Sequence, residues 1–549
     1  MAPTIPRIDL HIEDLERVVA RARHTPLNDD EYATLNAAIH TLGYVAQLLE
    51  AKGTTIAGLR QILFGARTEK TRDVLTRAGL DPASTAKSPG SDDGDSSPAA
   101  RAPRNRAAGH GRNGAAAYDG ARHVDVPHPR LTHGDRCPVC ADGTVYTQRA
   151  PGVLVRLVGQ APIAATVYAL EKLRCHLCGE LFTADPPPGV GAEKYDATTG
   201  AMVALLKYGS GVPFHRLERL QANVQIPLPA STQWEIVADT ATRIQPALEE
   251  LIRQAAHGEV LHNDDTSMTV LEVGRPGSTT GDPRSDDVSP DRTGVFTSGI
   301  VSTRDGQRVA LFFTGRRHAG ENLAQVLAKR AADLGPPIQM CDALSRNLPK
   351  PLQVILGNCL AHARRRFVDV TPSFPAECRH VLETLREVYR HDAQAREQRL
   401  SPDERLRFHH AQSGPLLAQL HEWLTAQIDE HRVEPNSGLG QAIAYLVTHW
   451  TPLTLFLRQP GAPLDNNICE RALKKAILHR KNALFYKTLN GAHVGDLFMS
   501  LIHTCELSGA NPFDYLTALQ RHATRLAANP PAWMPWNYRE TLTQLGVAA

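Results

Sequence analysis

Apolar residues in the first part of the chain recur with the period of a helix. Five of them are spaced seven residues apart: Leu35, Leu42, Leu49, Ile56 and Leu63. This spacing is typical of a coiled-coil seam. A break at Gly53 favours instead two helices that pack through their apolar faces. In both interpretations we predict a helical, leucine-zipper-like unit over residues 1–82.

The periodicity stops in residues 83–122, which are rich in Ser, Pro, Gly, Asp, Ala and Arg. A segment of this composition has too little apolar surface to pack a core. We therefore expect a disordered basic linker. Its second half carries several arginines, among them Arg112, which we predict to contact DNA phosphates.

Two C-x-x-C pairs follow in a segment of strand-like pattern: Cys137, Cys140, Cys175 and Cys178. Four thiolates at this spacing can fill a tetrahedral zinc site. The stretches 152–158 and 165–170 between the pairs alternate as strands do. We predict a zinc-binding ribbon over residues 123–190, with a closed structural Zn²⁺ site that has no position open for catalysis.

Residues 191–257 have a helical pattern interrupted by the proline-containing turn 224–229. We expect Ser231 to cap the helix after this turn. A helix, a turn and a capped helix are compatible with a helix-turn-helix that reads DNA. They are equally compatible with an ordinary helical connector.

The pattern then changes to strands at 259–271, 294–301 and 307–313, with a loop at 275–292. A helix is predicted over about 321–334, and a last strand ends at Asp342. Three hairpin-connected strands, a helix and a further strand that ends in an acid have the order of a ribonuclease-H-like sheet. We predict a mixed sheet with helices, whose first part spans 258–370.

After residue 370 the pattern is helical again. Residues 371–460 contain no strand pattern, so we predict an all-helical insertion in the catalytic core. The second part of the core spans 461–527 and begins with a basic helix that carries Glu470. The C-terminal tail, 528–549, is expected to be a loosely packed cover. The predicted fold class is therefore multidomain α+β.

Composition supports a globular chain of several domains. The chain has 549 residues, of which 42% are apolar, and a net charge of +2, so binding to a polyanion requires local basic patches. Its nine cysteines are accompanied by no secretory signal and no apolar run of membrane-spanning length. We expect a cytoplasmic protein with reduced thiols and no membrane contact.

Three carboxylates are candidates for metal-dependent catalysis. Asp264 and Asp342 lie on predicted strands, and Glu470 lies near the start of the basic helix. Mg²⁺ is held by carboxylates, waters and phosphate oxygens. Two such ions can stabilise both the attacking and the leaving oxygen of a phosphodiester. We predict that these three side chains hold two Mg²⁺ or Mn²⁺ ions.

The basic helix indicates where DNA binds. Lys474 and Lys481 share the helical face of Glu470, and a cationic stripe beside a carboxylate favours phosphate contact. The predicted DNA-binding residues are Lys474, Lys481, Arg471, Lys475 and Arg480 on this helix, together with Arg364, Arg365, Arg366 and Arg112. The spacing Cys359-x-x-His362 is typical of metal ligands but has no partner ligands in the sequence, so we predict no metal site there.

Several short stretches resemble one known family. They are Phe64–Lys70, Gly109–Gly114, both C-x-x-C pairs, His262–Thr266, Cys341–Asp342, Cys359–Phe367, Asp465–Leu473 and Gly509–Phe513. With these motifs the chain resembles the large transposase of the insertion-sequence-66 family, from about residue 30 to about residue 525.

The resemblance implies a DDE triad at Asp264, Asp342 and Glu470, which cuts transposon-end DNA and transfers the 3′-OH to target DNA. It also implies two small accessory transposition proteins, and we expect a homo-oligomer, a dimer or higher, on DNA. The family commonly has Asp-Glu where this chain has Asp264-Asp265. We prefer Asp264, because side chains alternate on a strand and the motif places the catalytic acid there.

Two alternatives stay open at this point. The chain is also compatible with a catalytically inactive DNA-end-binding or regulatory protein derived from a transposase. A metal-dependent nuclease without strand transfer has the same motifs.

Overall fold

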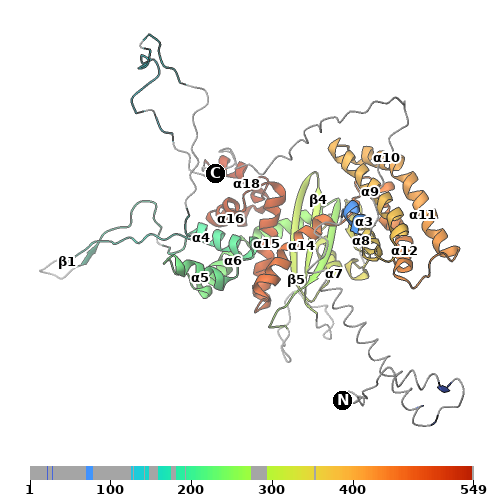
Figure 1. Ribbon diagram of the computed structural model, residues 1–549. Helices are drawn as coiled ribbons and strands as arrows, with labels where there is room; N and C mark the ends of the chain where they lie inside the picture. Colours follow the sequence, from blue (N-terminus) through green and yellow to red (C-terminus); the bar gives the residue numbers. More distant parts are fainter. Residues whose placement is uncertain are drawn as a thin grey trace. The chain divides into compact units, whose positions relative to one another are not determined.

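The computed structural model (Figure 1) describes residues 193–273, 294–350 and 354–546, together with shorter stretches at 70–77, 125–127, 129–140, 142–147, 159–174 and 181–191 and a few single residues near the N-terminus. The predicted mixture of helices and a mixed sheet is confirmed in these residues. The predicted units at 1–82 and 83–122 lie almost entirely outside them, apart from α3 (Thr71–Arg77).

The centre of the fold is a five-stranded mixed sheet with the order β5-β4-β3-β6-β7. Its strands are β3 (Val260–Ser267), β4 (Phe296–Arg304), β5 (Gln307–Gly315), β6 (Ile338–Cys341) and β7 (Ile355–Asn358). β3, β4 and β5 are antiparallel, whereas β6 and β7 run parallel to β3. The strand predicted to end at Asp342 is thus β6, which ends one residue earlier, at Cys341.

The sheet is preceded by helices. They are α4 (Ala197–Ala204), a π-helical turn η2 (Leu205–Gly209), α5 (Phe214–Asn223) and α6 (Ala230–Ala256). The helical prediction for this region is confirmed, but the predicted Ser231 cap is wrong. α6 begins one residue earlier, with Pro229 at its N-cap and no side-chain cap, because the extended backbone of proline already sets the entry into the helix.

Helix α7 (Ala319–Leu327) connects β5 to β6, and the 3-10 turn η3 (Ser345–Asn347) follows β6. α7 is shorter than predicted, since its pattern continues beyond Leu327 but the backbone does not. At its start the His318 backbone N–H donates to Glu321 Oε2 at 2.7 Å, so the Glu321 side chain satisfies the N–H of the N-cap residue.

Helix α14 (Asn467–Ala483) lies against β3 and β4. A Cβ atom on Gly299 would stand 3.0 Å from Leu473 and 3.4 Å from the sulfur of Cys469. The Cys469 thiol also donates to the Gly299 carbonyl, 3.3 Å away. The absence of a side chain at Gly299 therefore lets α14 approach the strand that pairs with Asp264.

Helix α15 (Leu489–Ser508) runs along the edge strand β5 (Figure 1). The backbone N–H groups of Ala310 and Phe312 donate to the hydroxyls of Thr504 and Ser500, both at 3.0 Å, and that of Thr314 donates to Asp496 at 2.7 Å. These side chains recur every fourth residue of the helix and meet alternate residues of the strand. They satisfy donors that an edge strand leaves unpaired.

The C-terminal part is better packed than predicted. Gly509 ends α15 with a positive φ of 70°, and Asn511 caps α16 (Pro512–Arg521). α17 (Ala523–Ala528), η5 (Pro530–Trp533) and α18 (Tyr538–Gln544) follow. Trp533 and Tyr538 are buried in the core, and the Tyr515 hydroxyl donates to the Trp533 carbonyl. The expectation of a loosely packed tail is therefore wrong, because its two large aromatic side chains complete the core around α16.

Between β7 and α14 the described chain is entirely helical. The helices are α8 (Leu360–Val370), α9 (Pro375–Glu397), α10 (Pro402–Gln412), α11 (Gly414–Asp429), α12 (Gly438–Thr448), α13 (Trp450–Leu453) and η4 (Leu455–Leu457). Residues 363–398 and 412–447 form one compact unit with α3, and the sheet belongs to the other.

The segment with the cysteine pairs contains a short hairpin, β1 (Lys172–Arg174) and β2 (Leu181–Thr183). The predicted strand at 165–170 is wrong: these residues are exposed and are not in a strand, and they pair with none of the strands in the described part of the chain. The other predicted strand, at 152–158, lies outside the described residues. In the described part of the chain, no helix is long and apolar enough to cross a membrane.

Candidate active site

Two of the predicted acids meet at one end of the sheet. The parallel register pairs His262 on β3 with Met340 on β6, and two residues further along are Asp264 and Asp342. Burial is the largest cause that raises the pKa of Asp264, and the negative charge of Asp342 is the next. Asp265 and Glu470 raise it further, and the pKa reaches about 7. The structure therefore brings all three predicted carboxylates into one electrostatic cluster.

The neighbouring Asp265 faces a different environment. Its carboxylate accepts from the His318 ring at 2.8 Å and lies 3.3 Å from the Arg346 guanidinium. Only 1% of its side chain is exposed. Alternation along β3 thus separates two adjacent acids: Asp265 contacts His318 and Arg346, and Asp264 lies near other carboxylates.

Buried amides hold Asp342 in place. The Asn347 side chain and the Leu344 backbone N–H both donate to Asp342 Oδ1. The carbonyl of Asn347 in turn accepts from the side chains of Asn263 and Gln339, at 2.8 and 2.6 Å. This network restricts the carboxylate to one orientation next to β3.

Glu470 lies in the first turn of α14, and Asn466 connects this turn to β3. The backbone N–H of Glu470 donates to the Asn466 carbonyl at 3.1 Å. The Asn466 side chain donates to the Asn263 carbonyl and contacts His262 Nδ1, both at 3.1 Å. Burial lowers the pKa of His262 to about 4, so its neutral ring can donate to the amide oxygen. Asn466 therefore determines how closely Glu470 approaches the strand that carries Asp264.

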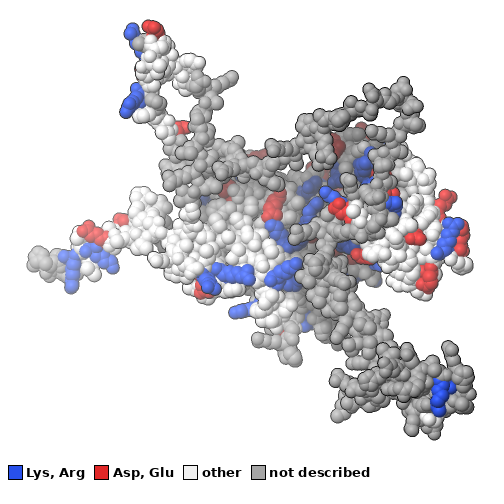
Figure 2. Space-filling model, viewed as in Figure 1, with Lys and Arg blue, Asp and Glu red and all other residues white. Residues whose placement is uncertain are grey.

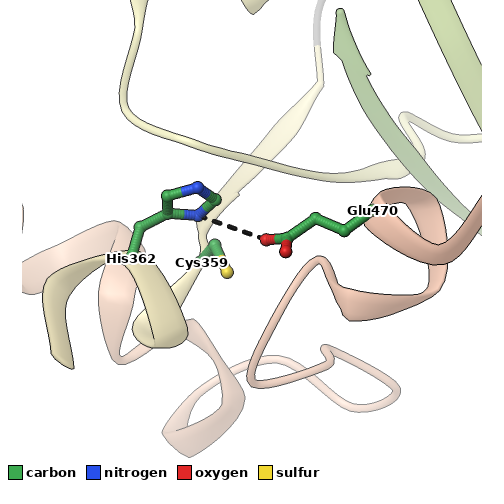
Figure 3. Close-up of side chains that lie close together, drawn as sticks. All are labelled: Cys359, His362 and Glu470. Carbon is green, nitrogen blue, oxygen red and sulfur yellow. Dashed lines mark ion pairs between the residues drawn. The ribbon is translucent and has the colours of Figure 1, made fainter. Parts of the chain in front are cut away.

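Glu470 also lies near Cys359, the residue before α8, and His362, in the first turn of α8 (Figure 3). Its Oε1 atom lies 3.6 Å from His362 Nδ1. The Cys359 sulfur completes a group whose possible ligand atoms all lie within 4.8 Å of one another. Burial raises the pKa of the Cys359 thiol to about 12, and N–H groups of Asn466 and His362 oppose this rise. The sequence showed the Cys359-x-x-His362 spacing but not that α14 would bring Glu470 to it.

The cationic residues of α14 divide into two groups. Arg471, Lys474 and Lys481 are exposed, and Lys and Arg side chains lie at the surface in the region where Figure 1 shows α14 (Figure 2). Lys475 pairs with Glu506 of α15 at 2.5 Å. Arg480 donates to Thr266 and to Ser267 at the end of β3. The last two therefore already have partners within the fold, which the sequence did not predict.

The other predicted DNA contacts are placed differently. Arg364 donates to Thr71 of α3 at 3.3 Å, and the exposed Arg366 lies 4.0 Å from the ring centre of Tyr445. Arg365 is half-buried on the same helix. Arg112 lies outside the described residues.

The structure describes two of the four predicted zinc ligands. Cys137 and Cys140 lie in a turn closed by the Cys137 N–H, which donates to the Gly143 carbonyl at 2.8 Å. Hydrogen bonds, the largest from the Cys140 backbone N–H, lower the pKa of Cys137. Cys175 and Cys178 fall outside the described residues, between β1 and β2. Hence the second pair follows one strand of a hairpin, and the four-thiolate site stays a prediction.

Comparison with known proteins gives one family. The family model described as "Transposase IS66 family" matches residues 194–494, more than half of the chain. An uncharacterized protein of Sinorhizobium fredii, y4jD, is 26% identical over 393 residues, which are 69% of this chain and 73% of that protein. A second uncharacterized protein of this organism, y4hP, is 25% identical and covers 67% of each chain. The matched region contains the sheet, the three carboxylates and α14.

Proposed function

Because the chain belongs to the IS66 family of transposases, we propose that it cuts the ends of a mobile DNA element and joins the freed 3′-OH to target DNA. Family membership indicates a transposase that acts on DNA. The observation that supports the specific chemistry is the burial of Asp264 near Asp342 and Glu470, since burial and then these negative charges raise the pKa of Asp264. Perturbed carboxylates of this kind cluster at catalytic sites.

The carboxylate cluster fits divalent metal ions. Burial and negative neighbours make the ionised form of Asp264 costly, and a hard cation that takes carboxylate oxygens would remove this cost. We propose that Asp264, Asp342 and Glu470 hold two Mg²⁺ or Mn²⁺ ions. When bound, such a pair lowers the pKa of an attacking water and stabilises the leaving oxygen of a phosphodiester.

The protein's own contribution is positioning. Asn347 holds Asp342, and Asn466 ties Glu470 to β3, so the three carboxylates are oriented before DNA arrives. Phosphoryl transfer needs little covalent chemistry from the protein and depends on alignment and charge neutralisation.

The strand order supports a ribonuclease-H-like core. Three antiparallel strands followed by two parallel ones, with acids on β3 and directly after β6, have the arrangement predicted for that fold. We further propose that the helical insertion, the zinc ribbon and the α5–α6 region belong to the DNA-binding apparatus. A homo-oligomer on DNA and small accessory proteins are part of the same proposal.

Exposed cations of α14 are proposed to guide DNA to the acids. Lys474 and Lys481 follow Glu470 by four and eleven residues on the same helix, and within the described residues neither forms an ion pair. Phosphate contacts of this type position DNA without reading its sequence.

The experiment is an end-joining assay with the full chain. Labelled DNA that carries the element's ends is incubated with Mg²⁺ and a plasmid target, and both nicked and joined products are scored. We expect both products from the wild type, and neither from Asp264→Asn, Asp342→Asn or Glu470→Gln, although each variant still binds end DNA. Nicks without joined products would identify a nuclease, and binding without nicks would identify an inactive end-binding protein. Either result overturns the proposal.

A further inference from the structure

A second group of possible metal ligands lies beside the carboxylate cluster. Cys359, His362 and Glu470 offer one sulfur, one nitrogen and one oxygen atom that lie within 4.8 Å of one another. Figure 3 shows the His362 ring facing the Glu470 carboxylate, with Cys359 beside them. Cys359 is buried, whereas 27% of the side chain of both His362 and Glu470 is exposed. The group is therefore partly accessible to solvent through His362 and Glu470.

Two atoms of this group are buried without a hydrogen-bond partner in the described part of the chain: His362 Nδ1 and Glu470 Oε1. Their separation of 3.6 Å exceeds that of a hydrogen bond. Nitrogen and oxygen ligands of one tetrahedral Zn²⁺, each about 2.1 Å from the ion, stand about 3.4 Å apart. A metal ion bound between His362 Nδ1 and Glu470 Oε1 would give both atoms a partner, and their separation of 3.6 Å is already close to the spacing that such an ion requires.

The third atom has the surroundings of a metal-binding sulfur. The Asn466 backbone N–H donates to Cys359 Sγ at 3.2 Å, and the N–H of His362 donates to the Cys359 carbonyl at 3.2 Å. The turn closed by the second bond brings Cys359 and His362 to the same side. N–H groups directed at sulfur stabilise the thiolate that binds metal.

We propose that Cys359, His362 and Glu470 form a three-ligand site for a transition-metal ion of the zinc class, with a fourth position open. A sulfur, an imidazole nitrogen and one carboxylate oxygen select a borderline-soft ion, whereas Mg²⁺ prefers oxygen ligands alone. Glu470 is shared: one of its oxygens faces this site, and the other remains for the carboxylate cluster. Only this sharing depends on the proposed function.

The test measures bound metal on the full chain, without DNA. Wild type and variants are dialysed against excess Zn²⁺, and zinc per chain is determined by elemental analysis. The absorption of Co²⁺-loaded protein reports on thiolate ligation. We expect Cys359→Ser and His362→Gln each to bind one ion fewer than the wild type, and Cys359→Ser to lose part of the Co²⁺–thiolate absorption.

Two matched controls keep the outcome specific. Cys505→Ser changes an equally buried thiol outside the group and should keep the ion. Asp342→Asn should keep it too, although it abolishes cleavage under the proposed function. Failure of cleavage in the wild type would leave the metal result standing, so the two proposals are tested separately.

Three results would overturn the inference. The first is wild-type zinc content in both Cys359→Ser and His362→Gln. The second is loss of the ion in Asp342→Asn, which would assign it to the carboxylate cluster. The third is lost cleavage in His362→Gln with wild-type zinc content, which would make His362 a positioning residue for Glu470 only. If Cys359→Ser does not fold, the comparison of zinc content rests on His362→Gln, because the His362 side chain is partly exposed.

Discussion

Two adjacent carboxylates on β3, those of Asp264 and Asp265, lie in different electrostatic surroundings. Asp264 lies among negative charges, and its pKa is raised to about 7 by burial and then by Asp342. Asp265 lies between His318 and Arg346. The first environment suits a metal ligand, and the second suits a structural ion pair.

This difference predicts opposite results for two isosteric changes. Asp264→Asn should abolish cleavage with little loss of stability, because it removes a charge that the metal-free fold tolerates poorly. Asp265→Asn should retain metal-dependent cleavage but lower the free energy of unfolding by about 1–3 kcal/mol, since this buried group loses its charge-assisted bonds to His318 and Arg346. Cleavage assays and thermal unfolding of both variants decide this. The reverse pattern would place the catalytic acid at Asp265.

A buried histidine on α14 predicts a pH effect. His479 stacks on Tyr486 with ring centres 4.1 Å apart, and burial, followed by the charge of Lys207, lowers its pKa from 6.5 to about 3. The fold therefore stabilises the neutral ring. The contribution of the neutral His479 ring to the free energy of unfolding is complete above pH 6.5. It is lost as the pH falls toward 3, by about 1.4 kcal/mol per pH unit below about 6.

We expect His479→Phe, which keeps a stacked ring, to weaken this loss of stability in acid. The measurement is the thermal midpoint of wild type and variant at pH 7.5 and pH 5. The difference between the two pH values should be smaller in the variant. An equal difference in both proteins would mean that His479 is already protonated, or is exposed, in the folded chain.

At the scale of one element, α14 carries both the proposed catalytic Glu470 and the lysines proposed to contact DNA. Lys474 and Lys481 are exposed, whereas Lys475 pairs with Glu506. Changing Lys474 and Lys481 together to Ala should lower affinity for end DNA and random DNA alike. It should also flatten the salt dependence of log K by about 0.9 per lost phosphate contact.

Lys475→Ala is the matched control, because its charge is already engaged within the fold. It should leave the salt slope close to that of the wild type. Fluorescence anisotropy at several salt concentrations measures all three proteins. An unchanged slope in the Lys474/Lys481 double variant would show that this helix face is only solvated.

The contact of α15 with β5 predicts a local stability effect. Ser500→Ala and Thr504→Val each leave a buried N–H of β5 without its acceptor, which costs about 1–3 kcal/mol. Hydrogen exchange of β5 should therefore become faster. Thr517→Val removes only a bond to its own helix, from its hydroxyl to the Phe513 carbonyl, and should leave exchange of β5 unchanged. Unaltered exchange in all three variants would mean that β5 does not depend on these hydroxyls.

At the scale of the whole molecule, the proposed zinc ribbon is separate in sequence from the five-stranded sheet. We expect freshly purified, reduced protein to hold zinc through Cys137, Cys140, Cys175 and Cys178, in a closed site that resists mild chelators. The double variant Cys137→Ser/Cys140→Ser should lose this chelator-resistant ion and bind DNA more weakly. A wild-type protein without chelator-resistant zinc would contradict the ribbon.

Local patterns in the sequence determined a large part of this protein. The alternation that ends at Asp342 predicted β6, and the helical spacing after Leu464 predicted α14 with Glu470 in its first turn. Strand order along the chain predicted a mixed sheet. These features depend on neighbours within a few residues, so periodicity and turn residues suffice to find them.

Only the tertiary structure decided which side chains meet. It directs Asp264 rather than Asp265 toward Asp342, gives Lys475 the partner Glu506 and buries Trp533 in the core. It also brings Glu470 to a Cys-x-x-His segment more than a hundred residues away in the chain. Such contacts depend on the packing of distant segments, which leaves no periodic signal in either segment. Burial and charge at the site, and hence its chemistry, arise from that packing.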